Sequence, residues 1–327
     1  MKKIAMLTTL LVLALVSPAF AADGEMLSRE PVPFDMDGLL EGLEGERRQR
    51  LQSMLEHADQ TIELSRITYE SDGLAVRGYL VVPKEVKDGE KLPCVIYNRG
   101  GTREFGALDD LPAALMLGPL AERGYVVVAG QYRGNGGGEG REEFGGADVR
   151  DVLNLIPLLE GLEYADASRI GMFGWSRGGM MTYQALARTD RIRAAVIGAG
   201  VADSFEWVAD RPEMETGVFA ELVPDWDDKR EQALEERSAV RWPEKLHKQT
   251  PILILHGTGD RRVSPKQALK MAEALLDARH PYRLMMFEGG DHGLRVFRDE
   301  VDEAVGEWLD RYVRDGESWP SLQPHGR

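Results

Sequence analysis

Short apolar runs alternate with longer amphipathic stretches along most of this chain. The short runs are apolar nearly throughout, which is the pattern of parallel strands buried on both faces of a sheet. They occupy residues 93–97, 125–129, 169–173, 193–197, 251–255 and 282–287. Stretches with helical periodicity lie between or after them, at residues 108–123, 148–159, 180–188, 265–278 and 296–312. The alternation predicts an α/β fold with a mostly parallel, doubly wound sheet that carries helices on both faces.

Two segments interrupt this alternation. In residues 65–82, apolar and polar positions alternate around the turn Ser71-Asp72-Gly73, which predicts an antiparallel hairpin. Residues 201–248 are rich in charged residues and carry irregularly spaced aromatic side chains, among them Trp207. We expect this segment to form a helical, cap-like insertion. It follows the carboxyl end of a predicted strand, so it either covers a ligand site at that edge of the sheet or only packs there.

The N-terminal residues have the three parts of a secretory signal peptide. Two lysines precede an apolar run at residues 4–16, and the small-residue site Ala19-Phe20-Ala21 follows it. The apolar run is too short for a membrane span. We therefore expect residues 1–21 to be a bacterial-type signal peptide that is cleaved after Ala21 or Ala22. The mature protein should be periplasmic or secreted, with no membrane contact.

The remainder of the chain is expected to have three parts. The polar residues 23–34 should be loosely held, and apolar residues at helical spacing in 35–64 predict amphipathic helices, so residues 22–65 should form an N-terminal helical segment. Residues 66–314 should form the main domain, and residues 315–327 a frayed polar tail.

Composition excludes several functions. The formal net charge of the 327 residues is −15, and such an acidic surface repels nucleic acid. Cys94 is the only cysteine, which excludes an internal disulfide, and its apolar neighbours predict a buried packing residue. The glycine-rich residues 134–140 lack the spacing of nucleotide-binding motifs. No motif for zinc or calcium occurs, so we expect no metal or other cofactor. The oligomeric state stays open.

A Gly-x-Ser-x-Gly pentad runs from Gly174 to Gly178. It follows the predicted strand at 169–173 and precedes the predicted helix at 180–188, so the local order is strand, tight turn, helix. A serine at such a turn projects its hydroxyl from the sheet edge, and the flanking glycines avoid collisions with the neighbouring strand and helix. The pentad alone is also compatible with a glycine-rich turn that contains an incidental serine.

Two later strand ends make the nucleophile interpretation of Ser176 specific. Asp260 follows the next-to-last predicted strand and His292 the last one, and the carboxyl ends of parallel strands share one edge of the sheet. Serine, acid, histidine is the chain order of α/β-hydrolase triads. The hydroxyl needs an imidazole to accept its proton, and the imidazole needs a carboxylate to fix its tautomer. The sequence therefore predicts Ser176 as nucleophile, Asp260 as orienting acid and His292 as base.

Other acids and histidines are weaker candidates. Asp291 adjoins His292 in the chain, and neighbouring loop residues point apart. Asp203 is an alternative acid near the end of the preceding strand. His256 lies at a strand end and is expected to be a core residue or to support the site, and His57 is expected to be a surface or packing residue.

Further motifs give the chain a family resemblance. The pentad occurs together with Tyr132-Arg133-Gly134, the run 145–149, the run 256–260 and Gly290-Asp291-His292-Gly293. Over residues 66–313 the chain thereby resembles the catalytic domain of the prolyl oligopeptidase-like serine peptidases. The resemblance implies an α/β-hydrolase fold and the same three catalytic residues. Members of that family usually carry a β-propeller before this domain. The segment before Arg66 is too short for one, so gating by size is not implied.

The resemblance also directs attention to the oxyanion donors. It makes the backbone N–H of Arg177 one donor. Many relatives have a tyrosine or a His-Gly-Gly run at the second position, whereas this chain has Asn98-Arg99-Gly100-Gly101. We expect a backbone donor at Arg99 or Gly100. Alternatively, the Arg99 guanidinium binds a substrate carboxylate. Trp175 and Trp207 are further candidates for substrate contact.

These observations lead to three hypotheses. The first is an exported serine hydrolase that forms an acyl-enzyme and acts as a prolyl oligopeptidase-like peptidase of short peptides. The alternative is a carboxylesterase of small esters, which has the same mechanism. A hypothesis from another class is a non-catalytic binding protein on the same fold. The expected partner is a small peptide or ester substrate.

Overall fold

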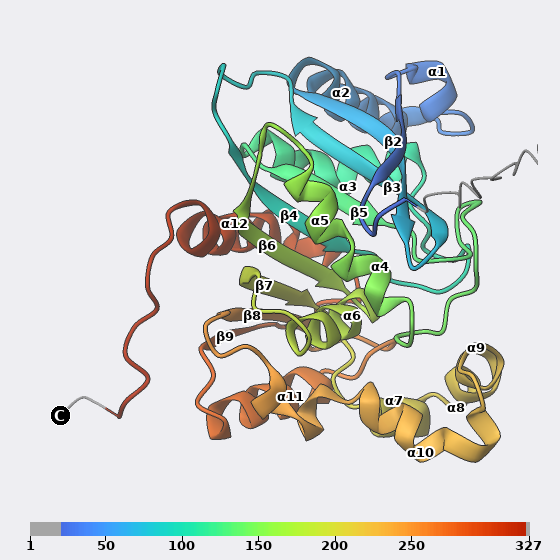
Figure 1. The fold of residues 1–327 in the computed structure, drawn as a ribbon, viewed down its shortest axis with the longest axis vertical. Coiled ribbons are helices and arrows are strands. Elements are labelled where there is room, and N and C mark those ends of the chain that lie inside the picture. The colour runs from blue at the N-terminus through green and yellow to red at the C-terminus, as the bar shows by residue number, and fades with distance from the viewer. Residues whose placement is uncertain (1–20, 325–327) are drawn as a thin grey trace, which may run out of the picture.

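The computed structural model describes residues 21–324, so the predicted signal peptide lies outside the described residues except for Ala21. The described chain contains a sheet of nine strands in the order β1-β2-β3-β5-β4-β6-β7-β8-β9 (Figure 1). The strands are β1 (Met26–Pro31), β2 (Ile62–Ser71), β3 (Leu74–Pro83), β4 (Leu92–Asn98), β5 (Val126–Gly130), β6 (Ala165–Trp175), β7 (Ile192–Gly198), β8 (Ile252–Gly257) and β9 (Tyr282–Phe287). Strands β4 to β9 pair in parallel, while β1, β2 and β3 pair in antiparallel fashion and β3 joins them to β5. The predicted α/β-hydrolase fold is confirmed.

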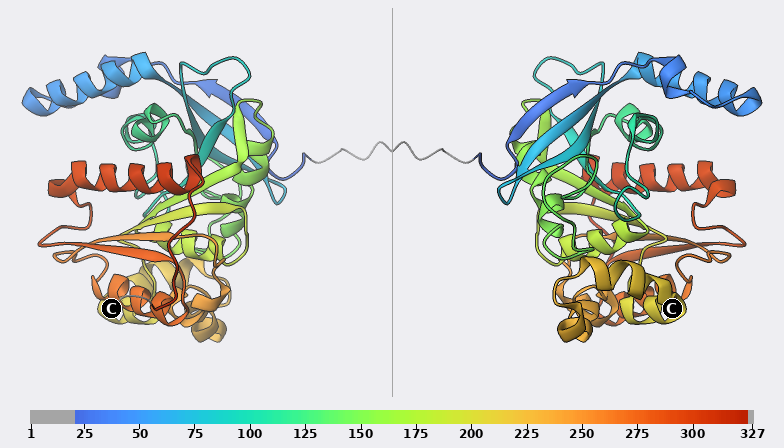
Figure 2. Two further views of the ribbon diagram at one scale, coloured as in Figure 1. Left: turned by 90° about the vertical axis from the view of Figure 1, so that its left-hand side faces the viewer. Right: turned by 90° about the vertical axis from the view of Figure 1, so that its right-hand side faces the viewer.

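Helices cover both faces of this sheet. The main-domain helices are α3 (Asp110–Glu122), α4 (Val149–Leu153), α5 (Leu155–Glu160), α6 (Arg177–Leu186), α11 (Lys266–Asp277) and α12 (Arg298–Leu309), and short turns η4 (Arg295–Phe297) and η5 (Asp310–Arg314) flank α12. Helices α3 and α12 pack on one face, and α4, α5 and α6 on the other (Figure 2). Side chains of β4 alternate between the two cores, since Val95 and Tyr97 face α3 whereas Cys94 and Ile96 face α6.

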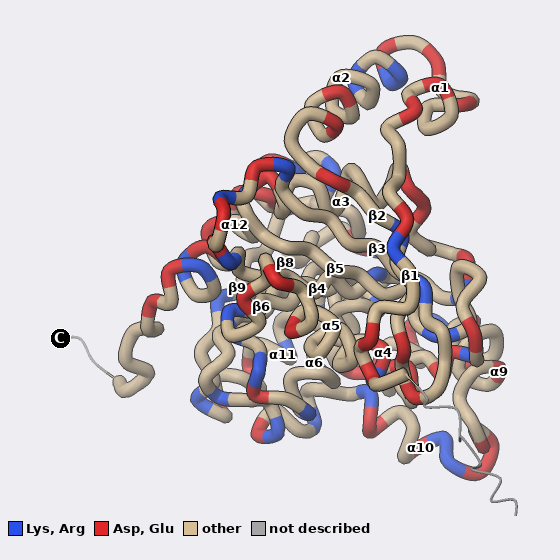
Figure 3. The backbone as a smooth tube through the Cα atoms, turned by 45° about the horizontal axis from the view of Figure 1, so that its top comes forward, with Lys and Arg blue, Asp and Glu red and all other residues tan. Residues whose placement is uncertain are grey.

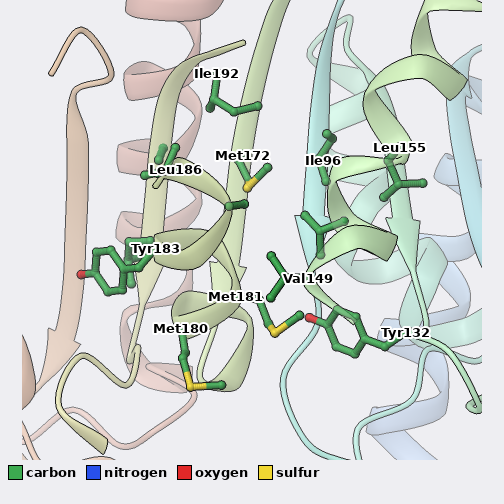
Figure 4. Packing of buried hydrophobic residues seen from close by; sticks show 14 of the residues in the cluster. Ile96, Tyr132, Val149, Leu155, Met172, Met180, Met181, Tyr183, Leu186 and Ile192 are labelled. Carbon is green, nitrogen blue, oxygen red and sulfur yellow. The ribbon is translucent and has the colours of Figure 1, made fainter. Parts of the chain in front are cut away.

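Helix α6 contributes long, unbranched and aromatic side chains to the core on its side of the sheet. Met180, Met181 and Tyr183 of α6 are almost completely buried. Figure 4 shows them with residues of the neighbouring strands and of α4 and α5. This packing fixes the helix that begins directly after Ser176, so the nucleophile is set on a rigid element.

The insertion between β7 and β8 is helical, as predicted. It comprises α7 (Ser204–Asp210), α8 (Pro212–Met214), the π-helical turn η1 (Glu215–Phe219), α9 (Ala220–Leu222), α10 (Trp226–Glu236), and the turns η2 (Ala239–Arg241) and η3 (Pro243–Lys245). These helices gather beside α11 at one end of the molecule (Figure 1). Trp207 stacks on Phe144 with ring centroids 6.0 Å apart, and Phe219 meets both rings edge-on. The insertion is therefore packed onto the main domain through aromatic residues.

The N-terminal segment differs from the prediction. Helices α1 (Met36–Leu39) and α2 (Gly45–Thr61) are present, but residues 26–31, expected to be loosely held, form β1 and pair with β2 from Met26 to Pro31. The side chains of β1 are mostly exposed because it is an edge strand, so its sequence lacks the apolar alternation that identifies half-buried strands. The segment thus contains the expected helices and also adds an edge strand to the sheet.

The C-terminal helix also begins later than predicted. Helix α12 begins at Arg298, and the side chain of Val296 before it is 91% exposed. The first buried apolar residue of the helix is Val301. Residues 315–324 contain no regular helix or strand, in agreement with a polar tail. Charged residues of both signs lie along the outer helices, including α2, α10 and α12 (Figure 3). Within the described residues, no helix combines the length and apolarity needed to cross a bilayer.

Candidate active site

Ser176 occupies a strained turn between β6 and α6. Its backbone has φ 59° and ψ −121°, a conformation that non-glycine residues rarely adopt. A hydrogen bond from Ser176 N to Gly198 O (2.8 Å) holds the turn against β7. A Cβ atom at Gly174 would lie 2.1 Å from Gly178 O, and one at Gly178 would lie 1.9 Å from Asn98 O. The glycines of the pentad are therefore required by close backbone packing, as predicted.

The structure brings Asp260 and His292 together at the same edge of the sheet. Nδ1–H of His292 donates to Oδ2 of Asp260 at 2.8 Å. The other carboxylate oxygen, Oδ1, accepts from the backbone N–H groups of Arg262 (2.8 Å) and Val263 (3.1 Å). Asp260 is thus fixed by its own loop and orients the imidazole of His292, which lines one cavity with Ser176.

The charge state of Asp260 is set by its hydrogen bonds. Burial raises the pKa of a carboxyl group, but hydrogen bonds from His256 and His292 outweigh it and hold the pKa of Asp260 well below its usual range. Asp260 is therefore ionised at neutral pH, as needed to fix the tautomer of His292 and to stabilise its protonated form.

His256 supports Asp260 from the interior. Its Nε2–H lies 2.9 Å from Val263 O and 3.3 Å from Oδ2 of Asp260, and its ring is completely buried. The imidazole therefore contacts the same carboxylate oxygen, Oδ2, that accepts from His292, and it does not border the cavity. This placement is that of a positioning residue, which is one of the two roles expected from the sequence.

The remaining acids and histidines lie elsewhere. Asp203 caps α7 by accepting from Phe205 N and Glu206 N, and it lies 3.5 Å from Lys270. The alternative role of Asp203 as triad acid is thereby wrong, because its carboxylate serves the helix while Asp260 holds the histidine. Asp291 is exposed and accepts from Arg295 N (3.1 Å). His57 is exposed on α2.

Both candidate oxyanion donors border the nucleophile. The backbone N–H of Arg177 is at the first position of α6, where helix N–H groups lack intrahelical partners. Gly100 is close to the serine, since a Cβ placed on it would lie 3.1 Å from Ser176 Cβ and 3.8 Å from Ser176 Oγ. The absence of a side chain at position 100 is what allows this backbone to approach Ser176.

The side chain of Arg99 has a structural role. It is 1% exposed and donates to Gln131 O through Nε (3.1 Å) and Nη2 (2.8 Å), to Gly100 O (3.1 Å) and to Arg103 O (3.0 Å). Its donors are thus occupied by backbone carbonyls. The prediction that Arg99 binds a substrate carboxylate is therefore wrong; sequence alone did not reveal that its guanidinium turns inward.

Arg177 forms an ionic scaffold that the sequence reasoning missed. Its guanidinium is 1% exposed, donates to Glu142 and, at 2.6 Å, to Asp148, and lies 4.5 Å from the ring centroids of both Tyr132 and Phe144. The only sequence signals for this scaffold were the arginine directly after Ser176 and the acidic residues of the run 142–148.

Glu142 connects this scaffold to the loop that carries Gly100. Its Oε1 accepts from Thr102 Oγ1 (2.9 Å) and Arg103 N (2.5 Å), while Nη1 of Arg177 also reaches Gly101 O (3.1 Å). The loop after β4 and the start of α6 are therefore tied together through one buried carboxylate. This tie sets the spacing between the two candidate oxyanion donors.

One cavity of about 1030 Å³ contains Ser176 and His292, which is at the upper end of the size range of small-molecule sites. Trp175 lines it and donates through Nε1 to His292 O (2.9 Å), and Trp207 lines it and donates to Arg262 O (3.0 Å). Both tryptophans proposed for substrate contact therefore border the cavity, and both also hold loops of the site in place.

Neither a metal site nor a reactive cysteine is found among the described residues. No group of three or more His, Cys, Asp or Glu side chains among residues 21–324 has an arrangement that could hold a metal ion. Cys94 is a free, buried thiol, and burial raises its pKa to about 12. It is thus a packing residue, as predicted, because a nucleophilic cysteine needs thiolate character.

Comparison with known proteins identifies the family of this chain. Residues 114–316 match the Prolyl oligopeptidase family, Peptidase_S9. The chain belongs to this family. It is 29% identical over 234 residues to the uncharacterized peptidase YtmA of Bacillus subtilis (71% of this chain and 87% of the relative), and 26% identical over 256 residues to dipeptidyl-peptidase 5 of Porphyromonas gingivalis (75% and 37%).

Solved structures lead to the same family. The acylaminoacyl peptidase of Pyrococcus horikoshii is similar with a TM-score of 0.66 at 25% identity, covering 80% of this chain and 44% of that one. A puromycin-hydrolyzing peptidase of Mycobacterium tuberculosis gives a TM-score of 0.63 at 27% identity, covering 76% and 39%. The chain therefore spans most of YtmA but less than half of these longer relatives. The relatives are serine peptidases, which supports peptidase activity in this chain.

Proposed function

We propose that this protein is an exported serine peptidase that cleaves short peptides through an acyl-enzyme. Ser176 is the nucleophile, His292 the general base and acid, and Asp260 the residue that orients His292. The observation that carries the proposal is the 2.8 Å hydrogen bond between His292 and Asp260 at the edge of the cavity that Ser176 also lines. A binding protein would not need this pair beside a strained serine.

The reaction follows from the positions of these groups. Nε2 of His292 accepts the proton of Ser176 as Oγ attacks the carbonyl carbon of the substrate. The negative oxygen of the tetrahedral intermediate is stabilised by the backbone N–H groups of Arg177 and Gly100. His292 then protonates the leaving amine, and the acyl-Ser176 ester remains. A water molecule, activated by His292, hydrolyses this ester and restores the serine.

Preference for short peptides is supported by the size of the site. The cavity is of the size that encloses a small ligand. Export is supported by the signal-peptide pattern of residues 1–21. Fractionation of the producing cells should therefore recover the protein outside the cytoplasm, beginning at Ala22 or Asp23.

The test is a screen of peptide anilides, short peptides and p-nitrophenyl esters with the wild type and with Ser176→Ala. We expect peptide turnover by the wild type and a loss of about 10⁴-fold or more in kcat/KM in the variant, since the triad acts as a unit. A fluorophosphonate probe should label the wild type at Ser176. The matched control is Ser53→Ala, an exposed serine on α2, which should behave as the wild type.

The possible outcomes separate the three hypotheses. Turnover of esters with no turnover of any peptide would contradict the peptidase proposal and identify a carboxylesterase. Absence of labelling and of turnover in a folded wild type would leave the non-catalytic binding protein. Equal activity of the wild type and Ser176→Ala would assign the reaction to another site.

A further inference from the structure

The catalytic cavity extends well beyond the triad, along one face of the sheet. On one side of Ser176 it is bordered by the insertion, at Trp207 and Val218. On the other side it continues past Trp175 and Gly293 into a groove between α3 and α12. We call this part the α3–α12 groove; its lining residues are Tyr97, Pro112, Met116, Leu120, Phe173 and Val301.

Helices α3 and α12 lie on the same face of the sheet (Figure 2), and residues of both helices line the cavity. The floor of the groove consists of Tyr97 from β4 and Phe173 from β6, whose rings meet edge-on with centroids 5.3 Å apart. Phe173 is in turn 6.2 Å from Trp175, next to the nucleophile. A continuous row of aromatic side chains therefore leads from the catalytic serine into the groove.

The groove is lined by apolar side chains and also by charged side chains of α3 and α12. The charged residues include Arg123 and Arg298, and each of these two has an acidic partner. Arg298 lies 2.8 Å from Asp302, and Arg123 lies 2.9 Å from Asp310. The ion pairs neutralise these charges and leave the apolar floor as the main binding surface. Burial of apolar groups is therefore the interaction this groove offers to a ligand.

The position of His292 decides which part of a substrate enters the groove. In acyl transfer the imidazole gives its proton to the leaving group, so the leaving atom lies beside the histidine. His292 and Gly293 stand at the mouth of the α3–α12 groove, whereas Arg177 and Phe144 border the insertion side. The groove thus continues in the direction of the leaving group.

We propose that the α3–α12 groove is a subsite for an elongated apolar leaving group, such as a peptide with long apolar side chains directly after the cleaved bond. The proposal rests on the proposed function, because it uses the direction of acyl transfer at Ser176. The stretch of α3 from Pro112 to Arg123 that lines the groove is about 16 Å long at 1.5 Å per residue, long enough for several extended residues.

The test uses two substrate series. In the first, the acyl side is constant and the residue after the cleaved bond is lengthened from alanine through norleucine to 2-aminodecanoic acid. In the second, only the acyl side is lengthened. For the wild type we expect kcat/KM to rise about three- to fourfold per methylene in the first series until the groove is filled. The second series should show a weaker dependence on length.

Met116→Trp is the variant that fills the groove, since Met116 lies on α3 and is partly exposed. It should abolish the length dependence of the first series, so that the longest substrate is turned over no faster than the alanine substrate. Met116→Phe, a smaller change, should remove part of the dependence and serves if the tryptophan variant does not fold. Leu269→Trp, an exposed position on α11, is the matched control and should retain the full dependence.

A binding measurement separates this proposal from the proposed function. Dansyl-labelled decylamine should bind to Ser176→Ala with increased fluorescence, and Met116→Trp in that background should weaken binding at least tenfold. Probe binding without turnover of any substrate would keep the groove as an apolar binding site and contradict the peptidase proposal and the leaving-group assignment. Turnover with a length dependence only on the acyl side would overturn the assignment. A change of oligomeric state in Met116→Trp would overturn it as well, because the substitution would then act through contacts between subunits and not by filling the groove.

Discussion

The two sides of the catalytic serine are built in different ways. On the His292 side, one carboxylate holds the imidazole, and that carboxylate is fixed mainly by N–H groups of its own loop. On the oxyanion side, the buried guanidinium groups of Arg99 and Arg177 tie several loops together. The group that must gain and lose a proton is thus held by a single hydrogen bond. The groups that must stay in place during the reaction are held by many.

The two arginines also differ from each other. Burial lowers the pKa of both guanidinium groups, but Asp148 and Glu142 reverse the effect at Arg177, whose pKa is raised, while that of Arg99 stays lowered. Arg177 has two carboxylates as hydrogen-bond partners, whereas the hydrogen-bond partners of the Arg99 guanidinium are backbone carbonyls. Each guanidinium is nevertheless 1% exposed, so the proposed mechanism assigns the negative charge of the intermediate to backbone N–H groups in a fixed arrangement.

The largest effect in this comparison is expected on the His292 side, from Asp260→Asn. Asparagine keeps the size of the side chain but no longer fixes the imidazole tautomer or stabilises its protonated form. We expect kcat to fall by about 10³- to 10⁴-fold, with little change in unfolding by urea. The measurement is kcat with a peptide anilide. A loss below tenfold would show that another acid, such as Asp291, orients His292.

The next effect is expected on the oxyanion side, from Arg177→Met. Removal of one member of a buried ion pair leaves the other charges without a partner, so the free energy of unfolding should fall by about 3–5 kcal/mol. The backbone N–H of residue 177 remains. The matched variant is Arg99→Met, which leaves carbonyl groups unpaired and should cost about 1–3 kcal/mol. Equal losses in urea unfolding would contradict the distinction between the two arginines.

The triad on the His292 side could be predicted from the sequence, whereas the contacts of the buried arginines on the oxyanion side could not. Ser176, Asp260 and His292 each lie in the loop or turn after the carboxyl end of a parallel strand, so the parallel topology alone predicts that they meet. The contacts of Arg99, Arg177 and Glu142 depend on how the loops after β4 and β5 fold back over the start of α6. No periodicity reports such contacts, so the sequence leaves open whether the Arg99 guanidinium binds a substrate carboxylate.

Two further features lay outside sequence reasoning for other physical causes. The strand β1 pairs through its backbone while its side chains stay mostly in solvent, so its residues carry no apolar pattern. The α3–α12 groove arises from the distance between two helices that are far apart in the chain. Apolar residues on both helices predict burial, but they do not tell whether the helices touch or leave a groove.

The smallest effect, and the one that isolates a single charge of the scaffold, is expected from Glu142→Gln. Burial raises the pKa of Glu142, but the charge of Arg177 and hydrogen bonds from Arg103, Arg177 and Thr102 outweigh it, so the pKa lies below its unfolded value. The stability gained from the ionised form is therefore complete above the unfolded pKa of about 4.3. It is lost as the pH falls from there through the lower pKa of the folded protein.

Glutamine at position 142 should therefore lower the free energy of unfolding by about 1–3 kcal/mol at neutral pH, and the difference from the wild type should shrink as the pH falls below about 4.3. Urea unfolding in steps of pH measures both quantities, with Glu300→Gln, an exposed position on α12, as control. Since Glu142 also holds the loop of Gly100, kcat should fall with KM little changed. A constant difference at every pH would mean that the carboxylate charge is not what ties this loop to α6.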